Sequence, residues 1–120
     1  MNNMNFNQAD LTYLMDLSNG NTVLIREILE LFIKQTPADM EVLSGYVARE
    51  DWDKAFKQAH HIKPTLAYVG ANHLRQELQE IEDAAKHRQE VESIAPKIAA
   101  MLPQLDVLYG ELKAYLETID

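Results

Sequence analysis

The sequence contains no cysteine, and this absence excludes both disulfide bonds and thiolate metal sites. Its first residues lack a basic segment followed by an apolar one, and no run approaches the ~20 apolar residues of a membrane span. We therefore expect a soluble, cytoplasmic protein without a membrane contact. Basic residues are also few, with 11 lysines and arginines against 19 acidic residues. The resulting charge of -8 repels phosphate backbones, so nucleic acid is not expected as a partner.

Patterns typical of β-strands are missing as well, since no alternating run of β-branched or aromatic residues stands between turn signals. Apolar residues instead recur at helical spacing almost throughout the 120 residues, which is the size of one domain. The sequence therefore predicts a single all-α domain over residues 1–120. The Met1 start and a last helix that extends almost to Asp120 favour a freestanding protein, and we expect a monomer.

Turn and capping residues divide the chain into six expected helical segments. These run from residue 8 or 10 to 17, from 22 to about 35, from 37 to about 50, from 52 to 69, from 72 onward, and from about 91 to 116. Asn21 and Asp51 are the expected N-caps, and Pro37 suits the first turn of a new helix. Pro96 and Pro103 predict a late start or a kink in the last helix. The pattern predicts an antiparallel up-and-down four-helix bundle with one or two short additional N-terminal helices.

Two adjacent histidines stand in the stretch AHHIKPTLAYVG, residues 59–70. Around them, apolar residues at alternating spacings of three and four form a seam that faces the core: Trp52, Ala55, Ala59, Ile62, Leu66 and Val69. His60 lies roughly 115° from the centre of that seam, on an open flank that it shares with Lys63. His61 points further outward, so it is expected to be a bystander.

A hairpin turn at Gly70 and Ala71 places the residue about eleven positions later at the height of His60. That residue is Glu82, and Gln79 lies one turn from it on the same face. An acceptor there fixes the tautomer by binding Nδ1–H of His60, which leaves Nε2 as a nucleophile. Lys63 can then offer charge-assisted hydrogen bonds to a phosphoryl group. The plainer interpretation is that His60 is an ordinary polar surface residue.

The motif AHHIKP at residues 59–64, with Gly70 ten positions after the histidine, resembles the A-H-x-L-K-G signature of histidine-containing phosphotransfer (HPt) domains. The resemblance covers about residues 8–88. It implies that His60 is the phosphoacceptor, that Lys63 is the family's lysine, and that Glu82 hydrogen-bonds the active imidazole. If His61 is aligned with the family's histidine instead, the lysine, the glycine and the preceding alanine of the signature no longer find a match in this sequence. Pro64 departs from the family's usual glycine, withholds an amide from the carbonyl of His60 and predicts a bend.

HPt domains carry a phosphoryl group and are not stand-alone catalysts, so the resemblance implies a role in a phosphorelay. His60 is expected to take the group from the aspartyl phosphate of a response-regulator receiver domain and to pass it to another receiver, with a hybrid histidine kinase as a further expected partner. The receiver supplies Mg²⁺, so no cofactor or metal of the chain's own is expected. The expected partner-binding residues surround His60: Phe56, Lys57, Pro64, Ala67, Leu11 and Leu14. For the two leucines, an ordinary core position is at least as well supported.

Three alternatives compete with phosphotransfer. A di-metal carboxylate bundle requires Glu-x-x-His pairs, but the residues three positions before the four histidines are Lys57, Gln58, Gly70 and Ala84. No serine has the context of a Ser-His-Asp site. A phosphate-independent scaffold or inhibitor that binds a receiver or kinase is the strongest alternative, and Pro64 is its main support. Phosphotransfer is favoured because a pure binding surface has no need of an oriented imidazole beside a cation.

Overall fold

The computed structural model describes residues 6–119, so residues 1–5 and 120 of the predicted domain lie outside the described part. The described chain forms five α-helices and one short 3₁₀-helix, and no strand. In order, they are α1 (Thr12–Ser18), α2 (Thr22–Ala48), α3 (Trp52–Tyr68), α4 (Asn72–His87), η1 (Val91–Ser93) and α5 (Ile94–Leu116). The predicted all-α class is confirmed.

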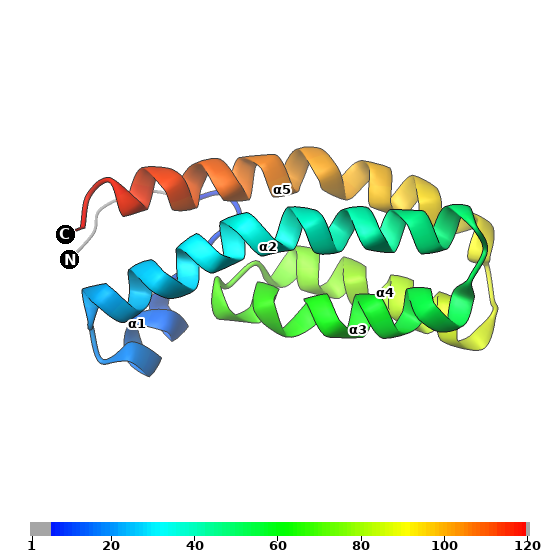
Figure 1. Ribbon diagram of the computed structural model, residues 1–120, viewed down its shortest axis with the longest axis horizontal. Coiled ribbons are helices and arrows are strands. Elements are labelled where there is room, and N and C mark those ends of the chain that lie inside the picture. The colour runs from blue at the N-terminus through cyan, green and yellow to red at the C-terminus, as the bar shows by residue number, and fades with distance from the viewer. Residues whose placement is uncertain (1–5, 120) are drawn as a thin grey trace.

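The four long helices alternate in direction along the length of the molecule and form an antiparallel up-and-down bundle (Figure 1). Each of them packs against two neighbours, and the α3–α4 contact is the most extensive. The short α1 flanks the bundle near the turn that joins α3 to α4 (Figure 1). One short N-terminal helix beside a four-helix bundle agrees with the predicted fold class.

The predicted break at Pro37 is wrong, because α2 continues through this residue as one helix of 27 residues. Its buried positions keep the same helical phase on both sides of the proline: Ile25, Leu29, Phe32, Thr36, Met40, Leu43 and Val47. An interior proline costs ~3 kcal/mol through a lost hydrogen bond and a steric clash. Burial of this uninterrupted stripe against α3 and α5 offsets that cost.

The first helix starts at Thr12 and not at residue 8 or 10 as predicted, whereas both predicted N-caps are confirmed. The Asn21 side chain accepts hydrogen bonds from the amides of Val23 and Leu24. The Asp51 side chain accepts one from the amide of Lys54. The last helix has the expected late start, because η1 precedes α5 and places Pro96 in the first turn of α5. An amide there has no partner within the helix, so a proline is tolerated at that point.

The turn between α3 and α4 fixes the register of these two helices. Gly70 has a φ of +68°, and a Cβ at this position would collide with the backbone carbonyl oxygen of Asp10. The amide of Asp10 donates to the carbonyl of Val69 at 2.8 Å, so the N-terminal segment crosses directly over the turn. Further along, the Glu111 carboxylate accepts hydrogen bonds from the backbone amides of the same segment: Asn7, Gln8 and Ala9.

The core runs along the whole bundle. The seam predicted on α3 is buried except at its first residue, Trp52, which is partly buried at the start of the helix. The inward positions predicted on α4 are also buried: Leu74, Leu78, Ile81 and Ala85. Within residues 6–119, no helix has both the length and the apolar character to cross a bilayer. The bundle therefore buries its apolar seams internally and leaves the flanks of α3 for other groups.

Candidate functional site

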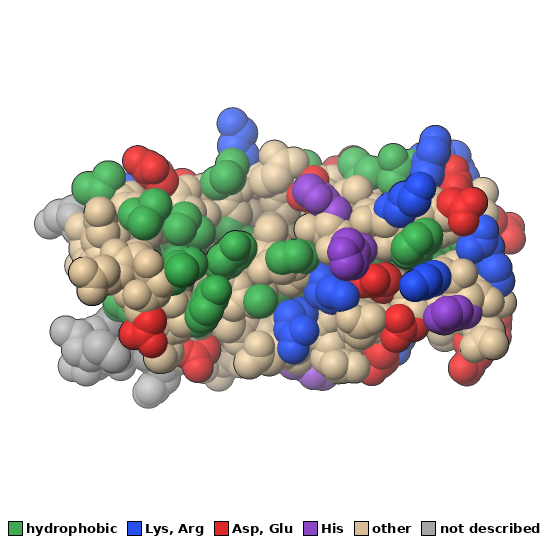
Figure 2. Space-filling model, turned by 90° about the horizontal axis from the view of Figure 1, so that it is seen from below, with side chains coloured by type: hydrophobic (Ala, Val, Ile, Leu, Met, Phe, Trp, Pro, Cys, Tyr) green, Lys and Arg blue, Asp and Glu red, His purple; other side chains and the backbone are tan. Residues whose placement is uncertain are grey.

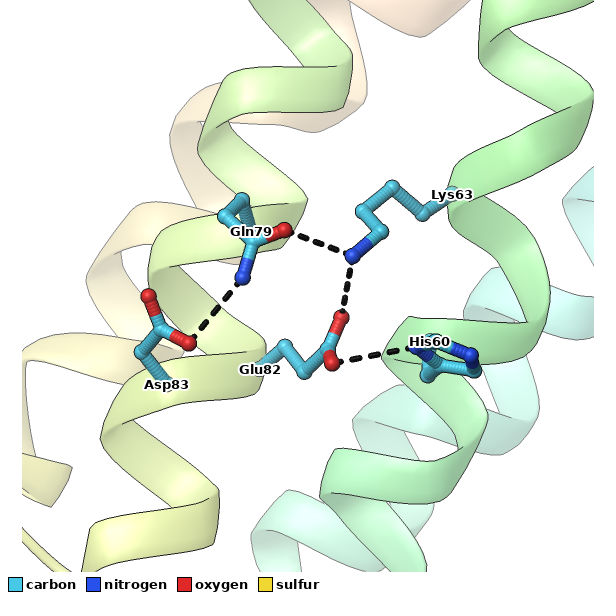
Figure 3. Close-up of polar contacts among 5 residues, drawn as sticks. All are labelled: His60, Lys63, Gln79, Glu82 and Asp83. Carbon is cyan, nitrogen blue, oxygen red and sulfur yellow. Dashed lines mark hydrogen bonds and ion pairs between the residues drawn. The ribbon is translucent and has the colours of Figure 1, made fainter.

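His60 lies on the flank of α3 that faces α4, and its side chain is 66% exposed. Its Nδ1 is 3.1 Å from Oε2 of Glu82, whose own side chain is only 12% exposed. The contact predicted between these two residues is therefore present. A carboxylate can only accept, so in the neutral imidazole Nδ1 carries the hydrogen. The lone pair is then on Nε2, which points away from α4 (Figure 3).

Lys63, one turn further along α3, is held between the two helices. Its Nζ donates to Oε1 of Glu82 at 2.8 Å and to Oε1 of Gln79 at 2.6 Å, and its side chain is 17% exposed. Glu82 thus uses one oxygen for His60 and the other for Lys63 (Figure 3). Gln79 contacts Lys63 and not His60, so it lies behind the residues that touch the imidazole, as a possible supporting residue.

Asp83 extends this arrangement by one residue. Nε2 of Gln79 donates to Oδ1 of Asp83 at 3.0 Å, so the amide presents its oxygen to Lys63 (Figure 3). The sequence alone does not point to Asp83, although its spacing of four residues from Gln79 on one helix is the signal that could have found it. We refer to the five connected residues, His60, Lys63, Gln79, Glu82 and Asp83, as the His60 network.

The charge of Glu82 is set by its position in this network. Burial raises the pKa of the carboxyl, but hydrogen bonds from Lys63 and His60 outweigh burial and leave the pKa below its ordinary value. Glu82 is therefore ionised at neutral pH, and its acceptor oxygens are always available to the imidazole. Across residues 6–119, no group of three or more histidine, aspartate or glutamate side chains is placed to hold a metal ion.

His61 lies on the other flank of α3, facing α2. Its Nε2 is 3.8 Å from Oδ2 of Asp39, and the carbonyl of Asp39 accepts a hydrogen bond from Gln58. His61 also lines a largely apolar cleft of about 470 Å³, which we call the α2–α3 cleft. The other main lining residues are Leu17, Ile28, Leu31, Phe32 and Tyr68. His61 is thus separate from the His60 network, but it borders a hollow surface that the sequence did not predict.

The structure separates the six predicted partner-binding residues into two groups. Four lie on α3 near His60: Pro64 and Lys57 are exposed, while Ala67 and Phe56 are half-buried. The other two are core residues, because the exposed fraction is 6% for Leu11 and 0% for Leu14. The core alternative is therefore correct for both leucines. The short helix α1 turns this apolar side inward because it must bury it against the bundle.

Four exposed apolar side chains lie along α1, α2 and α3, and none of them was predicted as a partner-binding residue. Tyr13 and Leu17 extend outward from α1, Leu31 from α2 and Tyr68 from α3. The rings of Tyr13 and Tyr68 lie 6.0 Å apart, in a shallow hollow that Pro64 and Ala67 also line. Figure 2 shows the face of the molecule seen from below, with apolar side chains gathered toward one end and histidine and cationic side chains near the middle. We call Tyr13, Leu17, Leu31 and Tyr68 the apolar patch.

The model of the Hpt domain family matches residues 27–120, which is most of the chain. The chain belongs to the Hpt domain family. Domains of this family carry phosphoryl groups in phosphorelay signalling and interact with response-regulator receivers. The match contains the complete His60 network and α5 but not α1, whereas the sequence motifs had placed the resemblance over residues 8–88. Comparisons with curated proteins and with solved structures give no significant match for this Hpt domain.

Proposed function

We propose that this Hpt domain accepts a phosphoryl group on Nε2 of His60 from the aspartyl phosphate of one receiver domain and transfers it to an aspartate of another. The observation that carries the proposal is the contact between Nδ1 of His60 and Glu82, with Nε2 pointing away from α4 on a side chain that is 66% exposed. An imidazole held in this way presents a lone pair where a second protein can reach it.

The transfer needs no proton shuttle within this chain. The lone pair of Nε2 forms a bond to phosphorus while the bond from phosphorus to the receiver's carboxylate oxygen breaks, and the carboxylate leaves. The hydrogen stays on Nδ1, so the imidazole ring becomes cationic. Glu82 is ionised and already bonded to Nδ1, so this hydrogen bond strengthens as the charge develops. In the reverse step, the aspartate attacks phosphorus, and Nε2 recovers its lone pair.

The receiver would bring the Mg²⁺ and its carboxylate ligands, and this chain would bring the nucleophile and a docking surface. Pro64 is exposed one turn from His60 on α3, and the apolar patch comes from α1, α2 and the end of α3. An apolar surface covered by a partner would place that partner's reacting aspartate beside Nε2 and would exclude water from the phosphoryl group. Lys57 is exposed one turn from His60 and offers a positive charge toward an acidic receiver site.

A phosphate-independent scaffold is the second candidate, and Pro64 is the observation that favours it. Pro64 is exposed beside the nucleophile and has no amide to bond the carbonyl of His60. A bundle of this shape could bind a receiver through the apolar patch without exchanging a phosphoryl group. The two candidates share the same surface and differ only in the chemistry of His60.

Transfer from a phosphorylated receiver separates these candidates. The wild-type chain, His60→Ala and His61→Ala are incubated with radiolabelled phosphoreceivers, and phosphate that is acid-labile and base-stable is measured on each. The proposal predicts label on wild type and on His61→Ala, and none on His60→Ala. Binding of receivers without any label on wild type favours the scaffold. Label that is lost in His61→Ala and kept in His60→Ala assigns the nucleophile to the other histidine.

A further inference from the structure

The segment before α1, residues 6–11, has no regular secondary structure, and we call it the N-terminal strap. Its backbone amides therefore need partners from other parts of the chain. The Glu111 carboxylate of α5 supplies them. Its Oε2 accepts a hydrogen bond from Asn7, and its Oε1 accepts from Gln8 and Ala9, both at 3.0 Å. Three consecutive amides near one end of the chain thus converge on one carboxylate near the other end.

Tyr115 lies one turn beyond Glu111 on the same face of α5 and adds two contacts. Its ring packs edge-on against Phe6, with the ring centroids 6.4 Å apart and the planes inclined by 72°. Its hydroxyl donates to the sulfur of Met15, a residue of α1, at 3.9 Å. One face of α5 therefore contacts both the N-terminal strap and the helix that follows it.

The other end of the strap is fixed at the turn between α3 and α4. The amide of Asp10 donates to the carbonyl of Val69 at 2.8 Å, and the missing Cβ of Gly70 leaves room for this approach. The side chain of Asp10 then accepts a hydrogen bond from the amide of Thr12, the first residue of α1. The strap thus places the start of α1 beside the C-terminal end of α3.

The helix α1 depends on these contacts for its position. It has seven residues, and a helix of this length is not stable through its own hydrogen bonds. Its outward side chains, Tyr13 and Leu17, form half of the apolar patch, and the Tyr13 ring lies 6.0 Å from that of Tyr68 on α3. The patch is therefore complete only while α1 is held beside α3. The family match begins at residue 27, so the strap and α1 both lie outside it.

We propose that Glu111 is a positioning residue for the partner-binding surface: by binding the N-terminal strap, it holds α1 where Tyr13 and Leu17 complete the apolar patch. Loss of the carboxylate releases the strap, and α1 then moves away from Tyr68. This assignment deepens the proposed function and rests on it, because the position of α1 affects phosphotransfer only if a receiver docks on the apolar patch. The position of α1 is itself a property of the free protein and is measured there without a receiver.

Two NMR measurements on the free protein test the contacts and the position separately. Hydrogen exchange of the three bound strap amides reports the contacts to Glu111, and nuclear Overhauser effects between the rings of Tyr13 and Tyr68 report the position of α1. In Glu111→Ala, we expect the three amides to exchange about tenfold faster or more, the size of effect that a charge-assisted hydrogen bond supports. The ring-to-ring effects should weaken in the same variant.

Glu111→Gln gives a finer test, because a carboxamide keeps one acceptor oxygen and replaces the other with a donor. The orientation that preserves two contacts directs the oxygen at Gln8 and Ala9 and the nitrogen at Asn7. Protection from exchange should therefore be retained at Gln8 and Ala9 and lost at Asn7. If Glu111→Ala does not fold, as judged by circular dichroism, this variant takes its place, with the Asn7 amide as the reporter.

Binding to a receiver tests the consequence for the partner. Glu111→Ala should raise the Kd for a receiver by about three- to tenfold and leave the transfer rate at saturating receiver unchanged, because the His60 network is intact. Glu117→Ala is the matched control. It removes an exposed glutamate at the C-terminal end of α5 that has no hydrogen bond or ion pair with the strap among the described residues. Amide exchange, ring-to-ring effects and Kd should all keep their wild-type values in this control.

Unchanged exchange of the strap amides in folded Glu111→Ala, or unchanged ring-to-ring effects, would overturn the proposal. A displaced α1 with an unchanged Kd would also overturn it, since the strap would then position no docking surface. An equal rise in Kd in Glu117→Ala would assign the effect to the loss of any negative charge at this end of α5. Failure of the proposed function looks different: the chain would accept no phosphate from any receiver, while amide exchange and α1 would still respond to Glu111→Ala.

Discussion

The two flanks of α3 differ in chemistry, although adjacent histidines mark them. Between α3 and α4, His60 is part of a connected set of charged and amide groups. Between α2 and α3, His61 borders an apolar cleft and lies 3.8 Å from one carboxylate oxygen. Two adjacent side chains on a helix point about 100° apart. His60 therefore faces α4, while His61 faces α2. Under the proposed function, the flank toward α4 would orient the nucleophile, and the flank toward α2 would offer an apolar surface to a partner.

The largest effect on the polar flank should come from Glu82→Ala. The variant leaves Lys63 without its carboxylate partner and His60 without an orienting acceptor, so we expect phosphotransfer to slow by roughly 10- to 100-fold. The unpaired Lys63 should also lower the free energy of unfolding by about 1–3 kcal/mol. Time-course phosphotransfer assays measure the change in rate, and urea denaturation measures the change in the free energy of unfolding.

Glu80→Ala is the control for this variant. Glu80 is on the same helix, but its carboxylate pairs with Lys97 of α5 and has no contact with the His60 network. It should keep the wild-type transfer rate. Equal slowing in Glu80→Ala and Glu82→Ala would mean that the overall charge of α4 matters and that the specific contact to His60 does not.

A smaller effect is expected on the apolar flank from Leu31→Ser. Leu31 is an exposed leucine that lines the α2–α3 cleft, so its loss should raise the Kd for a receiver by roughly 5- to 10-fold. The transfer rate at saturating receiver should not change, because the His60 network is untouched. Titration calorimetry measures the Kd. Leu102→Ser is the control, because it changes an exposed leucine on α5 and should leave the Kd unchanged. A slower transfer rate at saturating receiver in Leu31→Ser would argue against separate roles for the two flanks.

The smallest expected effect is the pH dependence of the contribution that Glu82 makes to the free energy of unfolding. Burial raises the pKa of Glu82, but the hydrogen bonds from Lys63 and His60 leave it lowered from 4.5. A lowered folded-state pKa contributes stability that is fully present above the unfolded value and is lost as pH falls through the folded value. The difference in the free energy of unfolding between wild type and Glu82→Gln, about 1 kcal/mol or less at neutral pH, should therefore shrink below pH 4.5. A difference that grows with acidification would contradict this linkage.

The sequence predicted the parts of this molecule that depend on helical periodicity and on the length of one turn. The contact between His60 and Glu82 follows from counting outward from Gly70, because an antiparallel hairpin with a fixed turn leaves no other register. The continuous α2 did not follow, since Pro37 is a local signal and the packing of α2 against two helices decided the outcome. The inward positions of Leu11 and Leu14 likewise depend on how α1 docks, which periodicity alone does not determine.

Within the site, sequence reasoning found the residues but not their contacts. Lys63 and Gln79 were both selected, yet their bond to each other depends on the reach of two flexible side chains across the helix pair. Asp83 was missed because an exposed carboxylate on a helix is usually solvated, and only the orientation of Gln79 gives it a partner. The apolar patch was missed because its four residues come from three different helices and are brought together only by the packing of those helices.

The central claim is that Nε2 of His60 is the phosphoacceptor. It is tested most directly by ¹⁵N and ³¹P spectra of the chain labelled in histidine and phosphorylated by a receiver. The account predicts a single phosphohistidine in which phosphorus is coupled to Nε2 of His60, while Nδ1 keeps its hydrogen and its contact with Glu82. Phosphorus coupled to a nitrogen of His61, or to Nδ1 of His60, would contradict it.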